Sequence, residues 1–406
     1  MQRVRMCLPW YRKFGWQAEV ICVDEKFVEG YREELLLKTI PGDVKVHKVK
    51  AFNAKSTRKF GLGSLSMRSY FQIRKKGSEL LKAGKFDLVF FSTTAFHVCH
   101  LGVYWKKKFN IPFVIDVQDP WRNDFYLDKP RDQRPPKFFL SYNIDKYLEA
   151  ATIPHSDGLI SVSKGYIETL KDRYPSPRNI PAVELPFPAS GADHEIASGV
   201  ASPVKLQGEC FNFVYAGRGG HDLAVALKIL FKAVNSGFQS GSLAGRIHFT
   251  FVGTSYAPAG KGGYTIKPIA REAGLESIVT EIPERIGYFE TLSLLKIADG
   301  LFVPGSTDTN YTASKIYPYI LAKKPLFAIF HESSSVVKVI KETGAGSVLT
   351  FNEHSRENQL VEECLEILID IVSKKSANIY DPETFEKYSA ETNAKLQTDF
   401  FDKILS

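Results

Sequence analysis

Short apolar runs alternate with amphipathic stretches along the first half of the chain. The runs are rich in β-branched and aromatic residues, which is typical of buried strands, and the stretches have helical spacing. The expected strands are Glu19–Val23, Val44–Val49, Leu88–Ser92, Phe113–Val117 and Leu159–Val162, and the expected helices are Arg3–Phe14, Leu65–Leu81, Val98–Phe109, Phe138–Ala151 and Tyr166–Arg173. Apolar strands separated by helices predict a parallel sheet that is covered on both faces.

The same alternation starts again after residues 186–210, a segment rich in proline, glycine and small polar residues. The expected strands of this half are Asn212–Ala216, Ile247–Val252, Gly300–Val303, Leu326–Ile329 and Ser347–Leu349, and the expected helices are Leu223–Val234, Phe289–Ala298, Val336–Glu342, Gln359–Val372 and Thr384–Ile404. The chain of 406 residues therefore predicts two doubly wound, Rossmann-like α/β domains at residues 1–200 and 201–380, followed by a helix within 381–406.

The start of the chain departs from the usual order of a doubly wound domain. Such a domain opens with a strand and a glycine-rich turn, but here the expected helix Arg3–Phe14 comes first and the first glycine is Gly15. Either a first strand lies upstream of Met1, which we favour, or the protein lacks that strand.

Composition excludes several classes of protein. The five cysteines are scattered and form no C-x-x-C pair, so neither a disulfide framework nor a zinc site is predicted and a reducing cytoplasm fits best. No apolar run approaches the roughly 18 residues of a membrane span. We expect a soluble cytoplasmic protein.

The strand Phe113–Val117 runs directly into polar residues. In open α/β sheets, ligands gather beyond the carboxyl ends of the strands, where Asp116, Asp119, Trp121 and Arg122 are expected to project. Alternatively, these residues only start a loop and close the edge of the core.

His97 follows another expected strand and opens a helix. A histidine there can act as an acid, a base or a hydrogen-bond partner. The alternative is a helix cap or a solvated side chain. No carboxylate lies near it in the sequence to complete a metal site.

The second half opens with a strand followed by Gly217, Arg218, Gly219 and Gly220. Glycines between a strand and a helix let backbone N–H groups approach a phosphate, and Arg218 adds a forked donor. The segment is neither G-x-G-x-x-G nor a P-loop, and a plain tight turn is the alternative.

Lys315 lies at the expected start of a later helix, with Thr312 or Ser314 as the N-cap. A lysine in the first turn opposes the helix dipole unless an anion is present, so this position favours a phosphate site. The alternative is a side chain that swings into solvent.

Several segments together resemble family 4 (group 1) glycosyltransferases. The matching motifs, in chain order, are Phe14-Gly-Trp-Gln-Ala-Glu-Val20, Asp116-Val-Gln-Asp-Pro-Trp121, Ile286-Gly-Tyr288, Leu295-Lys-Ile-Ala-Asp299, Ser314-Lys-Ile-Tyr-Pro-Tyr-Ile-Leu-Ala-Lys-Lys-Pro325 and Glu342-Thr-Gly-Ala-Gly346. They cover nearly the whole chain in the family's order.

The resemblance implies the GT-B fold, with two facing Rossmann-like domains and a C-terminal helix that packs back on the first. It implies transfer of a sugar from a nucleotide-sugar to a saccharide or lipid-linked saccharide, usually with retention, in surface-polysaccharide or glycolipid synthesis. It implies no metal and no resident cofactor, because the nucleotide-sugar is the donor substrate. The implied residues are Gly217, Arg218, Gly219, Ser314 and Lys315 for the donor phosphates, Arg285, Ile286 and Tyr288 for the base, His97 and Asp119 for catalysis, and Asp116, Trp121 and Arg122 on the acceptor side.

The sequence departs from the family pattern at several places. Pro318 replaces the glutamate that binds the ribose, Lys324 replaces a glycine, and Gln118 stands where arginine is common. The lysine that commonly follows the glycine-arginine pair is also absent, and His221 and Asp222 lie near its place. Two alternatives therefore stay open, a GT-B protein that binds a sugar-nucleotide or a partner without turnover, and a sugar-nucleotide epimerase.

The net charge of +8 is unevenly distributed. Residues 1–200 carry 32 Lys/Arg and 22 Asp/Glu, a net +10, and the remainder carries 21 and 23, a net −2. Within 44–85 there are twelve basic residues and one acidic residue, with Phe60 among the interleaved aromatics. Such a basic band is expected to bind an anionic membrane surface at the inner face through Arg74, Lys75 and Lys76. A solvated face is the alternative, and no nucleic-acid-reading module is visible.

Overall fold

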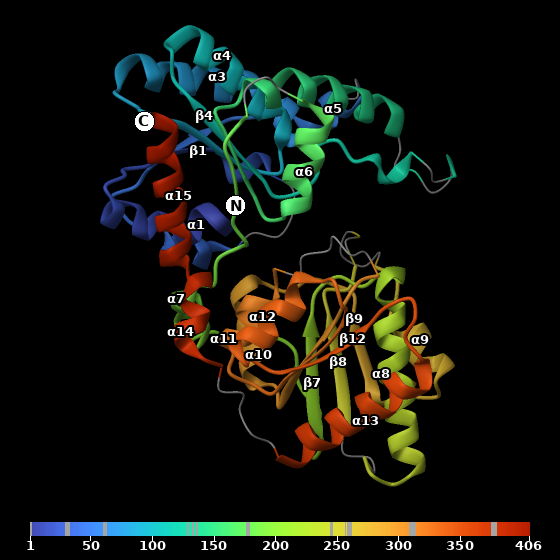
Figure 1. Cartoon of the computed structure of the whole chain (residues 1–406). Helices are drawn as coiled ribbons and strands as arrows, with labels where there is room; N and C mark the ends of the chain where they lie inside the picture. Colours follow the sequence, from blue (N-terminus) through green and yellow to red (C-terminus); the bar gives the residue numbers. More distant parts are fainter. Residues whose placement is uncertain are drawn as a thin grey trace. The chain divides into compact units, whose positions relative to one another are not determined.

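The strands belong to two units of the chain (Figure 1). The computed structural model describes residues 2–28, 33–59, 63–127, 130–131, 134, 137–175, 179–243, 247–255, 257, 262–307, 314–374 and 380–406, so that Phe60 and Thr312 lie outside the described residues. One unit comprises Met1–Pro188 with Ala390–Ser406, and the other comprises Ala189–Ser389.

The first unit is built from parallel strands and seven α-helices among its described residues. Its strands are β1 (Glu19–Val23), β2 (Lys45–Val49), β3 (Val89–Ser92), β4 (Phe113–Val117), β5 (Gly158–Ser161) and β6 (Ala182–Glu184). Its helices are α1 (Gln2–Tyr11), α2 (Ala54–Arg58), α3 (Leu65–Ala83), α4 (His100–Phe109), α5 (Phe138–Thr152), α6 (Lys164–Arg173) and α15 (Ala390–Leu405), with a short 3-10 turn, η4 (Phe96–Cys99), before α4.

The strands of this unit are divided between two sheets. In the described part of the chain, β1 pairs only with β2, and the other four strands follow the order β3-β4-β5-β6. We expected one sheet, so this is a difference from the sequence prediction.

Helix α15 packs against α1, which makes the C-terminal residues part of the first unit. The Tyr11 hydroxyl donates a hydrogen bond to Gln397 Oε1 at 2.7 Å. Phe400 lies against Gly158, where a Cβ atom would come within 2.8 Å of the ring. The expected helix Thr384–Ile404 is interrupted at Ser389, where extended backbone separates the residues of the two units.

The second unit contains one six-stranded parallel sheet among its described residues. Its strands are β7 (Phe211–Ala216), β8 (Ile247–Val252), β9 (Val279–Ile282), β10 (Gly300–Pro304), β11 (Leu326–His331) and β12 (Ser347–Phe351). Its helices are α7 (Gly191–Ala197), α8 (Ala224–Gln239), α9 (Lys267–Glu272), α10 (Tyr288–Ile297), α11 (Ile316–Leu321), α12 (Ser335–Thr343), α13 (Glu357–Lys374) and α14 (Pro382–Phe385).

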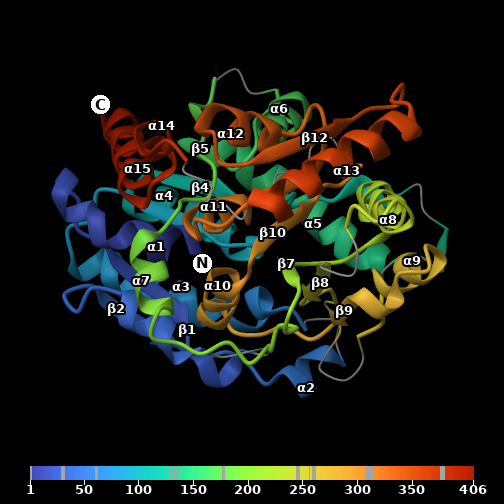
Figure 2. The same ribbon diagram turned by 90° about the horizontal axis from the view of Figure 1, so that it is seen from below.

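Aromatic residues form the core between this sheet and α8. Phe231 of α8 lies edge-on to Phe249 and Phe251, at ring-centroid distances of 6.4 and 6.5 Å. Phe249 stacks on Phe213 of the neighbouring strand at 5.3 Å. Helix α8 also packs against α13, which lies beside it in Figures 1 and 2. Edge-to-face and offset pairs of this kind stabilise a core beyond the area that they bury.

Residues 186–210 contain a helix that the sequence prediction missed. Ser190 caps α7, because its hydroxyl accepts a hydrogen bond from Asp193 N at 3.2 Å. Helix α7 packs against α10, so the two units divide after Pro188 and not at the expected residue 200. Strands β6 and β9 were also missed, since each is only three or four residues long and mixes polar with apolar positions.

Candidate functional site

The strand order of the second sheet reverses at one place. The order is β12-β11-β10-β7-β8-β9, so the chain continues from β7 toward one edge and from β10 toward the other. Ligands of open α/β sheets bind at such a reversal, beyond the carboxyl ends of the two strands. Arg218 follows β7, and Lys315 lies between β10 and α11, so both belong to this place in the fold.

The glycine loop after β7 uses two of its amide groups internally. Gly217 N donates to Val252 O at 2.9 Å, and Gly219 N donates to Thr254 O at 2.8 Å. These two N–H groups are therefore committed to holding the loop against the end of β8. The expectation that these two amides approach a phosphate does not fit this geometry.

Lys315 is held against the glycine loop. Its Nζ donates a hydrogen bond to Tyr215 Oη at 2.7 Å and lies 4.6 Å from the centre of that ring. A Cβ atom added to Gly217 would come within 2.1 Å of Nζ, so only glycine leaves room for the amino group. Lys315 directly precedes α11, one position before the expected first turn, and Ser314 before it is partly buried.

The environment of Lys315 disfavours its charge. Desolvation, followed by the positive charges of Arg218 and Arg285, lowers the pKa of Lys315 to about 7, and Asp222 acts in the opposite direction. A lysine whose pKa is lowered by burial and by two nearby guanidinium groups favours a site that accepts an anion. Arg218, Arg285 and Lys315 are called the cation cluster below.

Arg218 is oriented by a carboxylate four residues further on. Its Nη1 and Nη2 donate to Asp222 Oδ1 and Oδ2 at 2.8 and 2.6 Å, the forked arrangement that guanidinium groups form with carboxylates. Burial alone would raise the pKa of Asp222, but hydrogen bonds from Arg218 and Ser306 and the charge of Arg218 hold it below its usual value. The Asp222 carboxylate thus shows that a planar anionic group can bind this guanidinium.

The residues expected at the base follow β9. Arg285 is exposed, and a Cβ atom on Gly253 would lie 3.6 Å from its Cγ. Ile286 is partly buried, and Tyr288 begins α10 with its hydroxyl donating to Asp193 Oδ2 at 2.9 Å. The loop therefore brings Arg285 to the cation cluster, while Tyr288 is tied to α7.

His97 in the first unit has partners on both ring nitrogens. Nδ1 lies 2.6 Å from Ser66 Oγ of α3, and Nε2 lies 2.8 Å from Asp145 Oδ1 of α5. This arrangement joins η4 to both helices, so a contact from His97 to a sugar would replace one of the two bonds. Asp119, the other expected catalytic residue, is exposed just beyond β4.

Asp116 is fully buried. Its Oδ2 accepts hydrogen bonds from Arg3 Nε at 2.9 Å, Ser92 Oγ at 2.6 Å and Gln118 Nε2 at 2.6 Å. Both members of the ion pair with Arg3 have side chains that are 0% exposed. Asp116 is thus an interior charge in this structure, and the structure does not bring it to the surface beside Asp119.

Of the other two expected acceptor-side residues, Trp121 is buried and Arg122 is partly buried. Trp121 stacks on Phe96 with a ring-centroid distance of 5.6 Å. Arg122 Nε donates to Asp124 Oδ1 at 2.8 Å and to the Tyr142 hydroxyl at 3.0 Å. These contacts organise the loop after β4.

The basic band falls into a paired and an unpaired part. Lys45 and Lys48 on β2 form ion pairs with Glu19 and Glu25, acids that lie outside the band in sequence. On α3, Lys75 is exposed and Lys76 partly so, and neither has an ion pair recorded in the described residues. Helix α3 is therefore one of the parts of the band whose charge has no recorded ion pair among the described residues.

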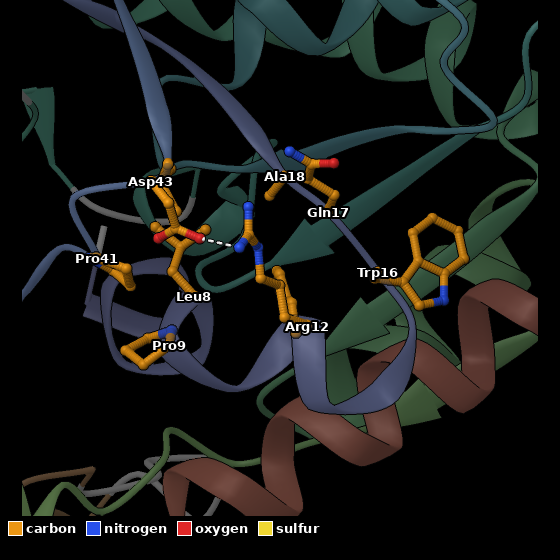
Figure 3. A pocket seen from close by; sticks show the side chains of 10 residues that line it. Leu8, Pro9, Arg12, Trp16, Gln17, Ala18, Pro41 and Asp43 are labelled. Carbon is orange, nitrogen blue, oxygen red and sulfur yellow. Dashed lines mark ion pairs between the residues drawn. The ribbon is translucent and has the colours of Figure 1, made fainter.

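A small pocket lies beside α1, lined by Leu8, Arg12, Trp16, Pro41 and Asp43 among others (Figure 3). Its volume is about 40 Å³, which is room for a few water molecules. Arg12 Nη1 and Asp43 Oδ2 form an ion pair across it at 2.7 Å. None of the expected site residues lines this pocket, and it is too small for a sugar.

Two other kinds of feature are absent from the described ranges. No cluster of histidine, cysteine and acidic side chains there could hold a metal ion. No helix there is long and apolar enough to cross a membrane.

The structure is similar to several solved glycosyltransferases, although the sequences have diverged widely. HepE from Anabaena, solved with UDP and glucose, is 13% identical, with a TM-score of 0.59 over 98% of this chain and 94% of that one. A glycosyltransferase from Rickettsia africae is 14% identical, with a TM-score of 0.58 over 100% and 94%. A UDP-forming trehalose-phosphate synthase from Burkholderia xenovorans is 8% identical, with a TM-score of 0.59 over 96% and 100%.

These similarities define the class of fold. The chain has the α/β fold of the GT-B glycosyltransferases, as the sequence predicted. No protein-family model matches the sequence, and no curated protein matches it. At these identities the likeness establishes the fold alone, because function depends on the residues of the site.

The sequence prediction missed two residues that shape the site. Tyr215 precedes Gly217 and binds both Lys315 Nζ and the carbonyl oxygen of Arg218, the latter at 2.8 Å. Asp222 orients the Arg218 guanidinium. A tyrosine in an apolar strand has the same pattern as any core aromatic residue, so no sequence signal marks Tyr215.

Proposed function

We propose that this protein is a glycosyltransferase that moves a sugar from a nucleotide-sugar, with a UDP-sugar as the first donor to test, to a saccharide or lipid-linked saccharide. The single observation that carries the proposal is the cation cluster at the strand reversal of a GT-B fold. HepE, which has the same fold, was solved with UDP and glucose, and this supports the choice of donor.

The chemistry assigned to the cluster is electrostatic. When the bond between the sugar and the diphosphate breaks, negative charge builds up on the leaving diphosphate. Arg218 and Lys315 are fixed in advance by Asp222 and Tyr215, so they offset that charge with little rearrangement. We propose that the transfer proceeds without a metal and with retention, and that His97 and Asp119 act on the sugar and acceptor.

The proposal predicts that Arg218→Ala weakens binding of the donor. Charge-assisted hydrogen bonds contribute about 1.5–3 kcal/mol, so we expect roughly 10- to 100-fold weaker binding of UDP-glucose or UDP in titration calorimetry. Arg271→Ala is the matched control, because Arg271 is 70% exposed on α9 and pairs only with Glu276 among the described residues. Equal affinities for the two variants would contradict the donor site.

Because Pro318 and Lys324 depart from the family pattern, two alternatives stay open: a protein that only binds a sugar-nucleotide, and an epimerase. Analysis of the reaction products distinguishes them. Incubation with UDP- and GDP-sugars and analysis of the products by NMR should show slow donor hydrolysis, or transfer to an added saccharide. Binding without any turnover would favour a protein that only binds sugar-nucleotides. An epimerised sugar-nucleotide would favour an epimerase.

We also propose that α3 binds an anionic membrane surface. Its exposed residues include Phe71 at 62% exposure and Lys75, and Lys76 is partly exposed. Basic residues near such a surface contribute about 1 kcal/mol each. We expect co-sedimentation with phosphatidylserine vesicles that Arg74→Glu/Lys75→Glu/Lys76→Glu reduces by more than about tenfold.

The control for the vesicle experiment is Lys45→Glu, which changes a lysine of the same band that is paired with Glu19 on the neighbouring strand. A loss of binding that is equal in both variants, or absent in the α3 variant, would remove the membrane assignment from α3.

A further inference from the structure

Tyr215 lies between the Arg218 loop and Lys315, the two parts of the proposed phosphate site. The residue is 1% exposed, and its hydroxyl donates its proton to the backbone carbonyl of Arg218 at 2.8 Å. The same oxygen accepts a hydrogen bond from Lys315 Nζ at 2.7 Å. Because its one proton is used on Arg218, the hydroxyl acts only as an acceptor toward Lys315. Both the neutral amine and the ammonium form of lysine can donate such a bond.

The groups around Lys315 carry more positive than negative charge. Arg218 belongs to the loop after β7, Arg285 follows β9, and Asp222 precedes α8. Both carboxylate oxygens of Asp222 are bonded to Arg218, so this carboxylate is engaged elsewhere and offsets only part of the positive charge. An ammonium group at Lys315 therefore has a neutral oxygen as its recorded partner and two guanidinium charges near it.

We infer that Tyr215 is a positioning residue that keeps the Lys315 amino group in place in either protonation state, and that binding of a nucleoside diphosphate group is coupled to uptake of one proton by Lys315. Before binding, above neutral pH, the nitrogen holds a lone pair. When the diphosphate enters, that lone pair takes a proton from water or buffer, and the proton returns when the nucleotide leaves. This inference rests on the proposed function, since it requires a diphosphate at the cation cluster.

The direction of the pH dependence follows from the depressed pKa of Lys315. Desolvation and the neighbouring guanidinium groups lower the pKa of Lys315 to about 7, and two phosphate charges beside it would shift this pKa upward. Below about pH 7 the lysine is already charged, so binding takes up few protons. Above that pH the uptake approaches one proton, and affinity falls by up to about tenfold for each further pH unit until the pKa of the bound state is reached.

The test is calorimetric titration of UDP-glucose into the whole 406-residue chain at about pH 8, in buffers that differ in ionisation enthalpy. UDP-glucose is the suitable probe because its diphosphate is esterified at both ends and does not itself titrate near neutrality. The dependence of the measured heat on the buffer gives the number of protons exchanged. We expect an uptake of more than about half a proton per site at pH 8, and a small uptake near pH 6.

Two variants assign the proton to this pair. Lys315→Arg carries a permanent charge and should bind UDP-glucose without proton uptake. Tyr215→Phe removes the acceptor of the Lys315 bond, so the charged amine is less stabilised and affinity should begin to fall at a lower pH than in the wild-type protein. A residue that only supports the fold would not move this midpoint.

Failure of the inference differs from failure of the proposed function. Wild-type binding with equal heats in all buffers, or proton uptake that persists in Lys315→Arg, would overturn the coupling and leave the donor site intact. An unmoved midpoint in Tyr215→Phe would remove the positioning role. No binding of UDP- or GDP-sugars at any pH between about 6 and 9 would overturn both.

Discussion

Arg3→Met is expected to lower the free energy of unfolding of the first unit by about 3–5 kcal/mol, the usual effect of removing one member of a buried ion pair. Arg3 is 0% exposed, and its guanidinium bonds to Asp116, to the carbonyl oxygens of Leu185 and Pro186, and to Asn393 Oδ1. Without Arg3, the Asp116 charge stays buried and uncompensated.

A second observation increases the expected effect. Asp116 Oδ1 has no hydrogen-bond partner in the part of the chain that the structure describes, so Arg3 is the main compensation for this carboxylate. Urea denaturation followed by circular dichroism would measure the change. Arg12→Met is the control, because Arg12 is 60% exposed in its pair with Asp43 and should cost about 1 kcal/mol or less. Similar decreases in the free energy of unfolding for both variants would contradict the conclusion that Arg3 compensates the buried Asp116 carboxylate.

Lys315→Met is expected to reduce turnover by about 100- to 1,000-fold, the usual effect of deleting one preorganised group that stabilises charge in a transition state. Gly217→Ala should have a comparable effect by a different route. Its new Cβ would lie 2.1 Å from Lys315 Nζ, which forces the amino group out of its position. Release of UDP from UDP-glucose, measured at saturating donor, gives the turnover rate.

Lys338→Met is the control for these two variants, since Lys338 is exposed on α12 and should leave turnover unchanged. Thermal unfolding of all three proteins would show whether a loss of turnover comes from unfolding. Full activity in Lys315→Met would mean that Lys315 does not contact the leaving group. Full activity in Gly217→Ala would mean that Lys315 can move away from the glycine loop without loss of turnover.

The largest differences between expectation and structure concern residues at strand ends. The sequence places Asp116 and Asp119 at the same carboxyl end of β4, and both were expected near a ligand. Only Asp119 is exposed, because Arg3 approaches Asp116 from α1, 113 residues away in sequence. A long-range partner of this kind leaves no periodic signal in the chain.

The glycine loop after β7 is a second place where a contact between residues far apart in sequence was not predictable. Glycine spacing after β7 predicted that backbone amides approach a phosphate. In the structure the atom near Gly217 is Lys315 Nζ, and the amides of Gly217 and Gly219 bond to Val252 and Thr254. Proximity of Lys315 to Arg218 was expected from the family resemblance. The hydrogen bond from Lys315 to Tyr215 was not expected, because it joins residues 100 positions apart.

The sequence by itself determined the alternation of strands and helices, the division into two α/β units and the fold class, because periods of two and 3.6 residues are local properties of the chain. Tertiary structure alone decided which charges are buried, that the β1–β2 pair is separate from the β3–β6 sheet, and which group faces the Lys315 amine. Burial and pairing depend on segments that meet only after folding, and they set the charge state on which the proposed chemistry depends.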